Sequence, residues 1–413
     1  LSGGGDPRGT SPELDRLLRE GALFPEATTV SPGSAASHAA LLTARYPVSN
    51  GVWSNFSVMD ESVTTLAELL RAKGFRTGGF VTNTFLGRRF RFDQGFDAYV
   101  ESGVVERLEE PSASVFSRSL ALVQILDRIR GRLEPGYDPS FDTALRWIAE
   151  SDRPTFWFVH LMDVHSPYAP PHPWGPRFGA ERAGRDTGPL GSRRNRFGWR
   201  PSEEAYLAEI RFADTKIGRL RRLLDELGRL DGACLVLTSD HGENLLDHEP
   251  NFSHGRTLYD ATLRVLTAIR WPGRVAAGAV DPRPIENVDL VPTLAALHGW
   301  EPDPDWQGRD AFGPGASRPI AWSQLARDFA ARTPAWKVVL AESGARERYE
   351  LATDPGETAP LPSAPGQIAP IEDALALWIA EHATDLYEQS RLVDRDELSP
   401  ETIEKLRTLG YLD

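Results

Sequence analysis

The chain has 413 residues, enough to bury a large core in one large α/β domain or in two smaller domains. Its net charge of −13 argues against non-specific nucleic-acid binding, which requires a basic surface. A single cysteine, Cys234, excludes internal disulfides and cysteine-rich zinc sites, and its place inside an apolar run indicates a small buried hydrophobe. No stretch approaches the roughly 20 consecutive apolar residues that cross a bilayer, so no membrane span is expected.

The first part of the chain alternates predicted helices and strands. Residues 1–9 read as a loop, and because an α/β domain normally starts with a strand, we expect a first strand to precede residue 1. Ser11 and Pro12 are expected to form the N-cap and first position of an amphipathic helix. Further elements follow in chain order, with helices at 37–43 and 64–73 and strands at 78–82 and 155–161.

The alternation continues to about residue 315. A long amphipathic helix is expected at 203–227, a buried strand at 233–238, another strand at 264–270 and a helix at 290–297. Helices alternating with strands predict an α/β fold with a mostly parallel central sheet flanked by helices on both faces.

The remainder of the chain has a different pattern. Short strands are expected near 319–322, 336–340 and 348–351, followed by helices up to residue 413. The sequence therefore predicts a catalytic domain at residues 1–315, its first strand missing, and a small C-terminal α+β subdomain at residues 316–413.

The strand at 233–238 runs into the sequence Asp240-His241-Gly242. Chemistry in open α/β sheets collects at the carboxyl ends of strands, and a carboxylate beside an imidazole suits one divalent cation. The alternative is a polar turn in which Asp240 caps the next element. The segment by itself leaves both interpretations open.

A second segment places Ser34 after a glycine-containing loop, at the front of a predicted helix. Free backbone N–H groups and the helix dipole favour an anion there, and a serine in that place can attack a phosphoryl or sulfuryl centre. The alternative is that Ser34 and Ser37 are ordinary helix caps.

An arginine-rich stretch at residues 169–201 interrupts the pattern directly after His165. Long irregular insertions in compact domains are usually functional loops or disordered segments. In one interpretation this stretch lines a cleft for an anionic substrate, and in the other it forms a solvated basic loop. The sequence leaves both interpretations open.

Residues 34–47 (SAASHAALLTARYP) resemble the signature of the sulfatase family, in which Cys or Ser is followed by x-Pro-Ser-Arg-x-x-Leu-Leu-Thr-Gly. Further similar segments follow in the family's order, at 10–15, 156–167, 238–243, 253–265, 287–294, 307–309, 349–357 and 406–412. The resemblance spans nearly the whole chain. It implies the alkaline-phosphatase-like superfamily and its fold, hydrolysis of sulfate esters, and a periplasmic or extracellular location.

The resemblance also assigns roles to individual residues. Ser34 takes the nucleophile position, which sulfatases oxidise to formylglycine, and Asp240 and His241 take metal-ligand positions. His165 and His254 fall where the family contacts the transferred anion or protonates the leaving oxygen. The implied substrate-binding residues are His38, Asn83 and Arg256.

The implied cofactor is one divalent metal ion, with calcium as the first expectation and manganese or magnesium if the substrate is a phosphoester. Asp240 and His241 alone would bind such an ion weakly, because the family's Asp-rich corner, which supplies further carboxylates, is expected before residue 1. The implied substrate is a small-molecule or glycan anionic ester.

Several positions depart from the family pattern. Ser34 excludes maturation from cysteine, Ala36 replaces the signature proline, His38 replaces its arginine, and residues 79–83 lack the family's lysine. These departures keep two alternatives open. One is a phosphodiesterase, phosphonate hydrolase or phosphotransferase that attacks with unmodified Ser34, and the other is a non-catalytic relative that binds an anion or a partner.

The remaining histidines are expected to serve packing or to face solvent. His248 is close enough in sequence to the predicted site to stay a candidate. The histidines outside the predicted site are His160, His172, His248, His298 and His382.

Overall fold

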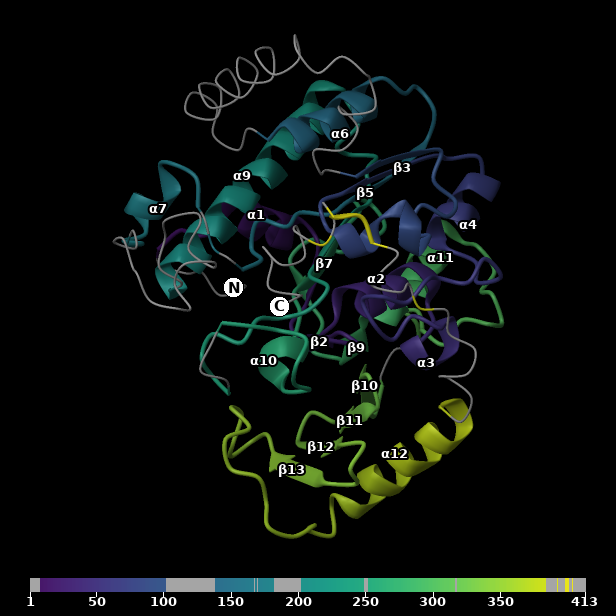
Figure 1. Cartoon of the computed structure of the whole chain (residues 1–413). Helices are drawn as coiled ribbons and strands as arrows, with labels where there is room; N and C mark the ends of the chain where they lie inside the picture. Colours follow the sequence, from purple (N-terminus) through teal and green to yellow (C-terminus); the bar gives the residue numbers. More distant parts are fainter. Residues whose placement is uncertain are drawn as a thin grey trace.

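The computed structural model describes residues 8–101, 138–166, 168, 170–181, 202–248, 252–315, 318–383, 392, 398–400 and 403. Two sheets occupy the centre of this part of the chain, and a separate antiparallel sheet lies beyond them (Figure 1). Within the described residues, no helix combines the length and apolar character that spanning a membrane requires.

One central sheet is parallel throughout. Strand β3 pairs with β4 on one side and with β5 on the other, both in parallel. Its strands are β4 (Ala98–Glu101), β3 (Arg76–Val81) and β5 (Thr155–Val159). The predicted strands at 78–82 and 155–161 are therefore confirmed with small shifts, and β5 ends two residues earlier than expected.

The other central sheet is mixed. Strand β7 runs antiparallel to both β6 and β1, whereas β8 is parallel to β1. The strands, in sheet order, are β6 (Leu235–Thr238), β7 (Thr267–Arg270), β1 (Ala22–Phe24) and β8 (Ala279–Val280). The sequence predicted a mostly parallel sheet without a direction for each strand, and β7 is an antiparallel member. The chain between β6 and β7 contains the short helix α10 (Asp260–Leu263) and returns at the same end of the sheet, so β7 runs in the opposite direction. Strand β6 ends the strand order and is half-buried, where the sequence predicted a fully buried strand.

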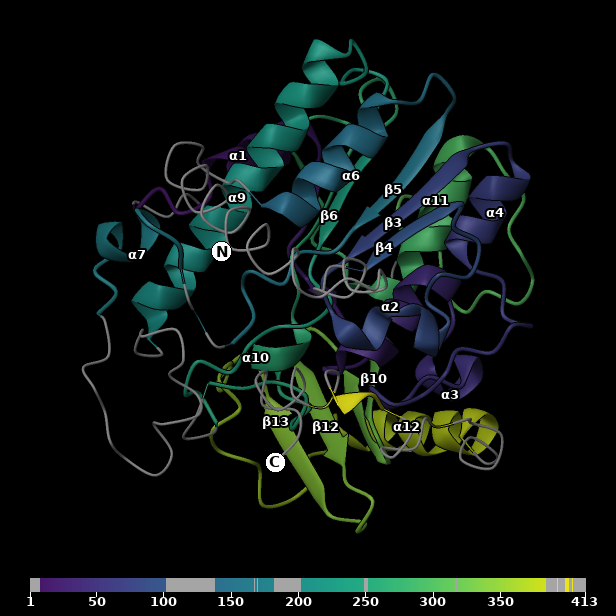
Figure 2. The same cartoon turned by 45° about the horizontal axis from the view of Figure 1, so that its top comes forward.

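Side-chain alternation along these strands explains why helices cover both faces. Phe24 and Ile269 pack into one core, whereas Leu23 and Ala268, one residue away on each strand, pack into another. The helices accordingly form two layers (Figure 2). One layer contains α1 (Pro12–Glu20), α6 (Pro139–Ala149) and α9 (Glu203–Glu226), and the other contains α2 (Ser34–Thr43), α4 (Leu66–Ala72) and α11 (Leu290–His298).

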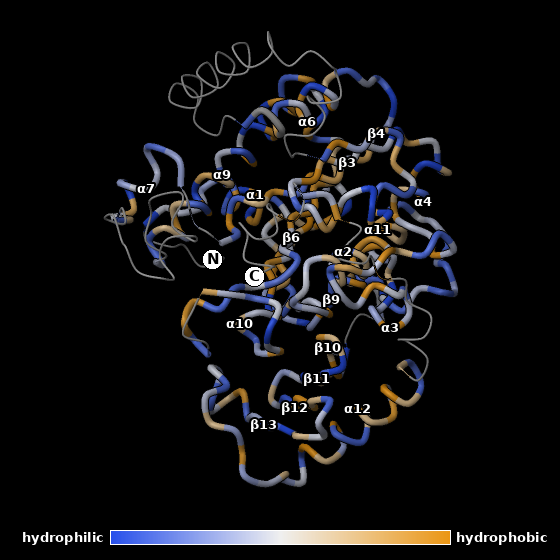
Figure 3. Tube along the Cα trace, in the orientation of Figure 1, coloured by the Kyte–Doolittle hydropathy of each residue, from blue (hydrophilic) through white to orange (hydrophobic). Residues whose placement is uncertain are grey.

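Helix α2 is the most deeply placed of these helices, and all ten of its residues are buried. Alanines at positions 35, 36, 39 and 40 keep the helix narrow and give it high intrinsic helix propensity. Figure 3 shows the hydrophobic residues concentrated on α2 and on the strands beside it. The helix begins at Ser34, three residues before the predicted start, which makes Ser34 its first residue.

Helix α1 matches the prediction, but its cap differs. Ser11 occupies the N-cap position and makes no side-chain capping bond. The carboxylate of Asp214, on α9, instead accepts hydrogen bonds from the backbone N–H groups of Glu13 (3.2 Å) and Leu14 (2.8 Å). Burial of this carboxylate raises the pKa of Asp214 to about 6. A tertiary contact therefore supplies the cap that the sequence had assigned to a serine.

The C-terminal region forms a four-stranded antiparallel meander with one helix packed on it (Figure 1). Its elements are β10 (Ala321–Leu325), β11 (Asp328–Arg332), β12 (Trp336–Leu340), β13 (Arg346–Glu350) and α12 (Ala369–His382). The α+β composition agrees with the prediction, although strand β11 was missed and the segment at 406–412 lies outside the described residues. The boundary at residue 315 stays a prediction.

Cys234, just before β6, has no reactive character in this setting. The side chain is partly buried, and burial raises the pKa of the Cys234 thiol to about 12. Since the thiolate is the nucleophilic form, the thiol behaves as the small hydrophobe that the sequence indicated.

Short elements complete the described part of the chain. Strands β2 (Ala27–Thr28) and β9 (Ile285–Glu286) pair in parallel. Each of them is followed directly in sequence by a segment that contributes residues to the site described below. The remaining elements are α3 (Pro47–Asn50), α7 (Trp174–Arg177), η1 (Thr84–Leu86), η2 (Arg88–Phe90) and η4 (Asn287–Asp289).

A buried cation holds the C-terminal sheet against α10. Lys337 on β12 is fully buried, and its Nζ lies 2.8 Å from Asp260 and 2.7 Å from Glu357. We expect Lys337→Met to lower the free energy of unfolding by about 3–5 kcal/mol, because it removes the cation paired with the buried Glu357 and leaves Asp260 with Arg332 alone. Urea denaturation measures the change.

The matched control is Lys73→Met, at the exposed end of α4, where the Lys73 ammonium lies over the ring of Trp300, 5.5 Å from its centroid. We expect a change within about 1 kcal/mol for this variant. Equal stability of the two variants would contradict the importance of the Lys337 ion pairs.

Candidate active site

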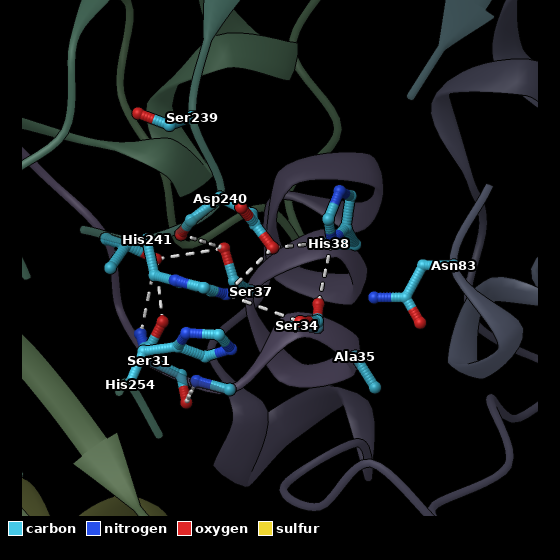
Figure 4. Close-up of polar contacts among 12 residues, drawn as sticks. Ser31, Ser34, Ala35, Ser37, His38, Asn83, Ser239, Asp240, His241 and His254 are labelled. Atoms are coloured by element: carbon cyan, nitrogen blue, oxygen red, sulfur yellow. Dashed lines mark hydrogen bonds and ion pairs between the residues drawn. The ribbon is translucent and has the colours of Figure 1, made fainter. Parts of the chain in front are cut away.

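The candidate residues converge on the amino end of α2 (Figure 4). Ser34 is the first residue of that helix, and Asp240 and His241 follow β6. Asn83 follows β3, and His254 comes from the segment before α10. Because the ends of strands and a helix terminus meet here, residues more than 200 positions apart in sequence lie within hydrogen-bond distance.

Ser34 is buried, and its hydroxyl Oγ lies 3.3 Å from Nε2 of His241. The loop before it is shaped by Ser31, whose Oγ accepts from Gly33 N (3.2 Å), and by Asn55, whose Oδ1 accepts from Ala35 N (3.0 Å). The hydroxyl thus lies at a helix N-terminus, the position the sequence predicted for a nucleophile facing an anion.

Asp240 is the central charge of the site. Its Oδ2 lies 3.2 Å from Nε2 of His241 and 3.6 Å from Nδ1 of His38. Burial alone would raise the pKa of Asp240, but the surrounding histidines, His241 foremost, hold it well below its usual range. The carboxylate is therefore ionised at neutral pH, as a metal ligand must be.

A buried hydrogen-bond network fixes the backbone of Asp240. Ser37 Oγ donates to the carbonyl of Asp240 (2.6 Å). Thr29 Oγ1 and Asn287 Nδ2 donate in turn to Ser37 Oγ, at 2.9 and 3.0 Å. Ser37 is therefore more than a helix residue, because it ties α2 to the end of β6.

Gly242 allows the chain to turn away from β6 at close quarters. A Cβ atom at this position would lie 2.2 Å from the carbonyl oxygen of Ala261, which is far inside van der Waals contact. Only glycine fits this close approach of two backbones. The glycine after Asp240 and His241 is thus required by packing.

His160 joins the site although the sequence assigned it to packing or solvent. One ligand atom from each of His38, His160 and Asp240 lies within 4.8 Å of the others. The Nδ1 atom of His160 is 3.0 Å from Thr82 Oγ1, and burial lowers the pKa of His160 to about 3. The sequence analysis extended the strand to residue 161, whereas β5 ends at Val159 and leaves His160 as the first residue beyond it.

A second histidine group lies beside Ser34. The ring of His254 stacks on that of His241 (centroids 4.1 Å apart) and meets His165 edge-on (4.6 Å). His254 Nδ1 is 3.2 Å from a carboxylate oxygen of Glu243. Burial lowers the pKa of both His165 and His254 to about 3 and raises that of Glu243 to about 7.

The predicted substrate-binding residues have different placements. The Nδ1–H of His38 donates to the carbonyl of Ser34 (2.7 Å), so this ring supports the nucleophile position. Asn83 is buried, accepts from Phe85 N through Oδ1 (2.9 Å), and points its amide nitrogen toward Ser34 (Figure 4). Arg256 is exposed, and the described contacts do not connect it with Ser34 or Asp240.

Two further expectations from the sequence concern His248 and the arginine-rich stretch at residues 169–201. His248 stacks on Tyr259 with ring centroids 3.9 Å apart, which gives it a packing role. In the arginine-rich stretch, Arg177 lies over the ring of Trp174, at 5.1 Å from its centroid. The remaining arginines of that stretch, at positions 182, 185, 193, 194, 196 and 200, lie outside the described residues.

Comparison with known proteins gives curated relatives of moderate identity. Human N-acetylgalactosamine-6-sulfatase is 26% identical over 333 residues, which cover 73% of this chain and 60% of that protein. The ulvan-active sulfatase of Formosa agariphila is 24% identical over 304 residues, covering 71% of this chain and 58% of that protein. The chain thus spans about 60% of the length of these relatives.

Solved structures resemble the fold over almost the full chain. A structure described as a complex with its substrate D-glucosamine-2-N,6-O-disulfate has a TM-score of 0.68 at 20% identity and covers 94% of both chains. The phosphonate monoester hydrolase of Agrobacterium radiobacter has a TM-score of 0.69 at 20% identity and covers 96% of this chain and 95% of that one. These likenesses identify the fold as alkaline-phosphatase-like. A family model described as Sulfatase matches residues 1–300, and the chain therefore belongs to the sulfatase family.

Proposed function

We propose that the protein hydrolyses sulfate monoesters, with Ser34 at the nucleophile position and a divalent cation bound beside it. The observation that carries this proposal is the contact of Ser34 Oγ with Nε2 of His241, because the same nitrogen faces the ionised Asp240. Nucleophile position, proton acceptor and metal-ligating carboxylate are thus adjacent. Sulfatases among the curated relatives, and a solved structure of the same fold in complex with a sulfated glucosamine, support a sulfated glycan as the substrate class.

The residues present fit a divalent cation. Asp240 offers an ionised carboxylate in a buried position, and His38 and His160 offer neutral imidazoles close to it. His241, the other ligand that the sequence predicted, lies between Asp240 and Ser34. A bound cation supplies Lewis-acid stabilisation of the charge on the ester oxygens.

His241 is positioned to accept the proton of Ser34. Its Nδ1–H donates to the carbonyl of Gly242 (2.8 Å), so in the neutral ring Nε2 carries the lone pair that faces Ser34 Oγ. As the Ser34 oxygen forms its bond to the central atom of the ester, the bond from that atom to the leaving oxygen breaks, and the proton of Ser34 passes to Nε2 of His241. If Ser34 is oxidised to formylglycine, a hydroxyl of the aldehyde hydrate occupies the same position.

His165 and His254 are the candidate proton donors for the leaving oxygen. Their pKa values of about 3 keep both rings neutral in the described chain at neutral pH. A bound dianionic or monoanionic ester places negative charge against the rings and favours their protonated form. His38 and Asn83 complete the surroundings of Ser34, and Arg256 stays a prediction from the sequence.

A second candidate function keeps the same site and changes the ester. Phosphonate monoester hydrolases are among the solved structures with this fold, and His241 offers a base that makes direct attack by unmodified Ser34 feasible. This candidate hydrolyses phosphonate or phosphate esters without formylglycine.

The first test replaces the nucleophile. We expect Ser34→Ala to lower the hydrolysis rate of an aryl sulfate by at least about 1,000-fold, because no other group replaces the attacking oxygen. The unfolding temperature should stay near that of the wild type, since one hydroxyl is lost. The control is Ser239→Ala, whose side chain points away from the cluster (Figure 4). Retained turnover in Ser34→Ala would move the nucleophile elsewhere.

Mass spectrometry of the peptide that contains Ser34 separates the two candidate functions. Sulfatase chemistry predicts an aldehyde in place of the hydroxyl, which lowers the peptide mass by two hydrogens. An unmodified Ser34 in a protein that hydrolyses a phosphonate monoester supports the second candidate. An unmodified protein that hydrolyses neither ester supports a non-catalytic, anion-binding or partner-binding role.

The third test removes the central carboxylate. We expect Asp240→Ala to lower metal-dependent hydrolysis by at least about 100-fold, since a Lewis acid supplies several kcal/mol of stabilisation that added metal cannot restore without its ligand. Asp231→Ala is the control, because that side chain is 98% exposed. Activity near the wild-type level in Asp240→Ala would refute the assignment of the site.

A further inference from the structure

A buried ion cluster lies on helix α9, outside the residues assigned to the site. Nζ of Lys216 lies 2.6 Å from Oδ2 of Asp138 and 2.7 Å from Oδ1 of Asp163, and the Lys216 side chain is 1% exposed. Asp138 directly precedes α6, the helix beside α9 (Figure 2), and Asp163 follows β5. Hydrophobic side chains of similar volume often stabilise a protein as well as a buried ion cluster does, so stability alone does not explain a lysine here.

Asp163 belongs to the turn that presents His165. The backbone N–H of His165 donates to the carbonyl of Met162 (3.1 Å), which closes a tight turn with Asp163 at its second position. Strand β5 ends at Val159, so the turn lies beyond the parallel sheet. The ion pair with Lys216 therefore ties this turn to helix α9.

The carboxylate of Asp163 relies on Lys216 for its compensating charge. Within the described residues, Asp163 Oδ2 is buried without a hydrogen-bond partner, and Oδ1 accepts the hydrogen bond from Lys216 Nζ. Removing the ammonium leaves a buried carboxylate without this cation, an arrangement that is strongly disfavoured. The side chain then moves or takes up a proton, and the turn loses its tie to α9.

The turn places His165 close to the nucleophile position. The ring of His165 meets that of His254 edge-on, with centroids 4.6 Å apart, and His254 stacks on His241 at 4.1 Å. Nε2 of His241 lies 3.3 Å from Ser34 Oγ. A shift of the turn therefore displaces a ring that packs against the residues around Ser34.

Helix α9 contacts the same segment at a further point. The ring of Tyr206, on α9, lies 5.3 Å from the ring of Tyr168, between centroids. This contact follows His165 in sequence, whereas the Lys216 contact precedes it, so α9 supports the chain on both sides of the histidine. We propose that Lys216 is a positioning residue of the active site, which holds Asp163 and thereby places the ring of His165.

The inference rests on the proposed function for the role of His165, so the first measurement is independent of turnover. In the full chain, Lys216→Met should raise the hydrogen–deuterium exchange rate of residues 160–166 by at least about tenfold, because the turn loses its tie to α9. Exchange in β12 serves as the reference for global unfolding. The matched control is Arg221→Met, which removes the ion pair of Arg221 with Glu20 (2.5 Å) on the same helix and should leave residues 160–166 unchanged.

The second measurement is a double-mutant cycle with His165, using the ester that the wild type hydrolyses. Lys216→Met should lower kcat by at least about tenfold, because misplaced groups slow the chemical step, and should change KM by less than about twofold. In the His165→Ala background, Lys216→Met should lower kcat no further, since a residue that acts through His165 loses its effect when that ring is absent. A merely structural lysine would lower kcat by the same factor in both backgrounds.

A second variant covers the case in which Lys216→Met does not fold. Asp163→Asn keeps the shape of the side chain and removes the charge that Lys216 holds, while Asp138 remains paired with the ammonium. It should raise the exchange of residues 160–166 and lower kcat in the same direction as Lys216→Met.

Two results would overturn the inference. One is unchanged exchange of residues 160–166 in the variants of Lys216 and Asp163, and the other is an equal fall in kcat with and without His165. These failures differ from failure of the proposed function. Faster exchange confined to this turn in a protein that hydrolyses no ester would refute the function and keep the turn placed by Lys216, whereas ester hydrolysis with unchanged exchange would do the reverse.

Discussion

The carboxylate of Asp240 lies in a buried position where its backbone is fixed and its Oδ2 faces the rings of His241 (3.2 Å) and His38 (3.6 Å). The backbone is fixed through Ser37, which in turn is held by Thr29 and Asn287. A buried charge of this kind is costly unless its partners are in place before the charge acts. The placement of α2, with Ser34 at its first position, follows from the same bonds, since Ser37 belongs to that helix.

The hydrogen bonds that fix Asp240 are supported by residues near the C-terminal sheet. Asn287 lies between Glu286 and Asp289, and both acidic residues pair with Arg318, at 2.6 and 2.5 Å. Arg318 also donates to the hydroxyl of Tyr46, which follows α2 (2.7 Å). The arginine that precedes the C-terminal sheet therefore supports the segment that holds Asp240. Trp322, on β10, donates its backbone N–H to Glu286 (2.7 Å), so the antiparallel meander, far from the nucleophile in sequence, supports the same segment.

His38 and His160 lie side by side, close to the carboxylate of Asp240. His38 stands where the signature has arginine, and a guanidinium cannot ligate a cation whereas an imidazole can. The position of His160 beside it follows from the pairing of β3 with β5, which brings the end of β5 next to Thr82.

The sequence by itself determined the alternation of helices and strands, the position of Asp240 and His241 at a strand end, and Ser34 at the start of a helix. Local patterns suffice for these features, because apolar periodicity, strand-ending polar residues and a glycine-containing loop act over a few positions. Only the tertiary structure decided the direction of β7, the capping of α1 by Asp214 and the inclusion of His160. Each of these features depends on which segments lie side by side after folding. Strand β5 ends two residues earlier than predicted, so His160 lies beyond the strand and close to Asp240, where the sequence analysis had expected a histidine used in packing or facing solvent.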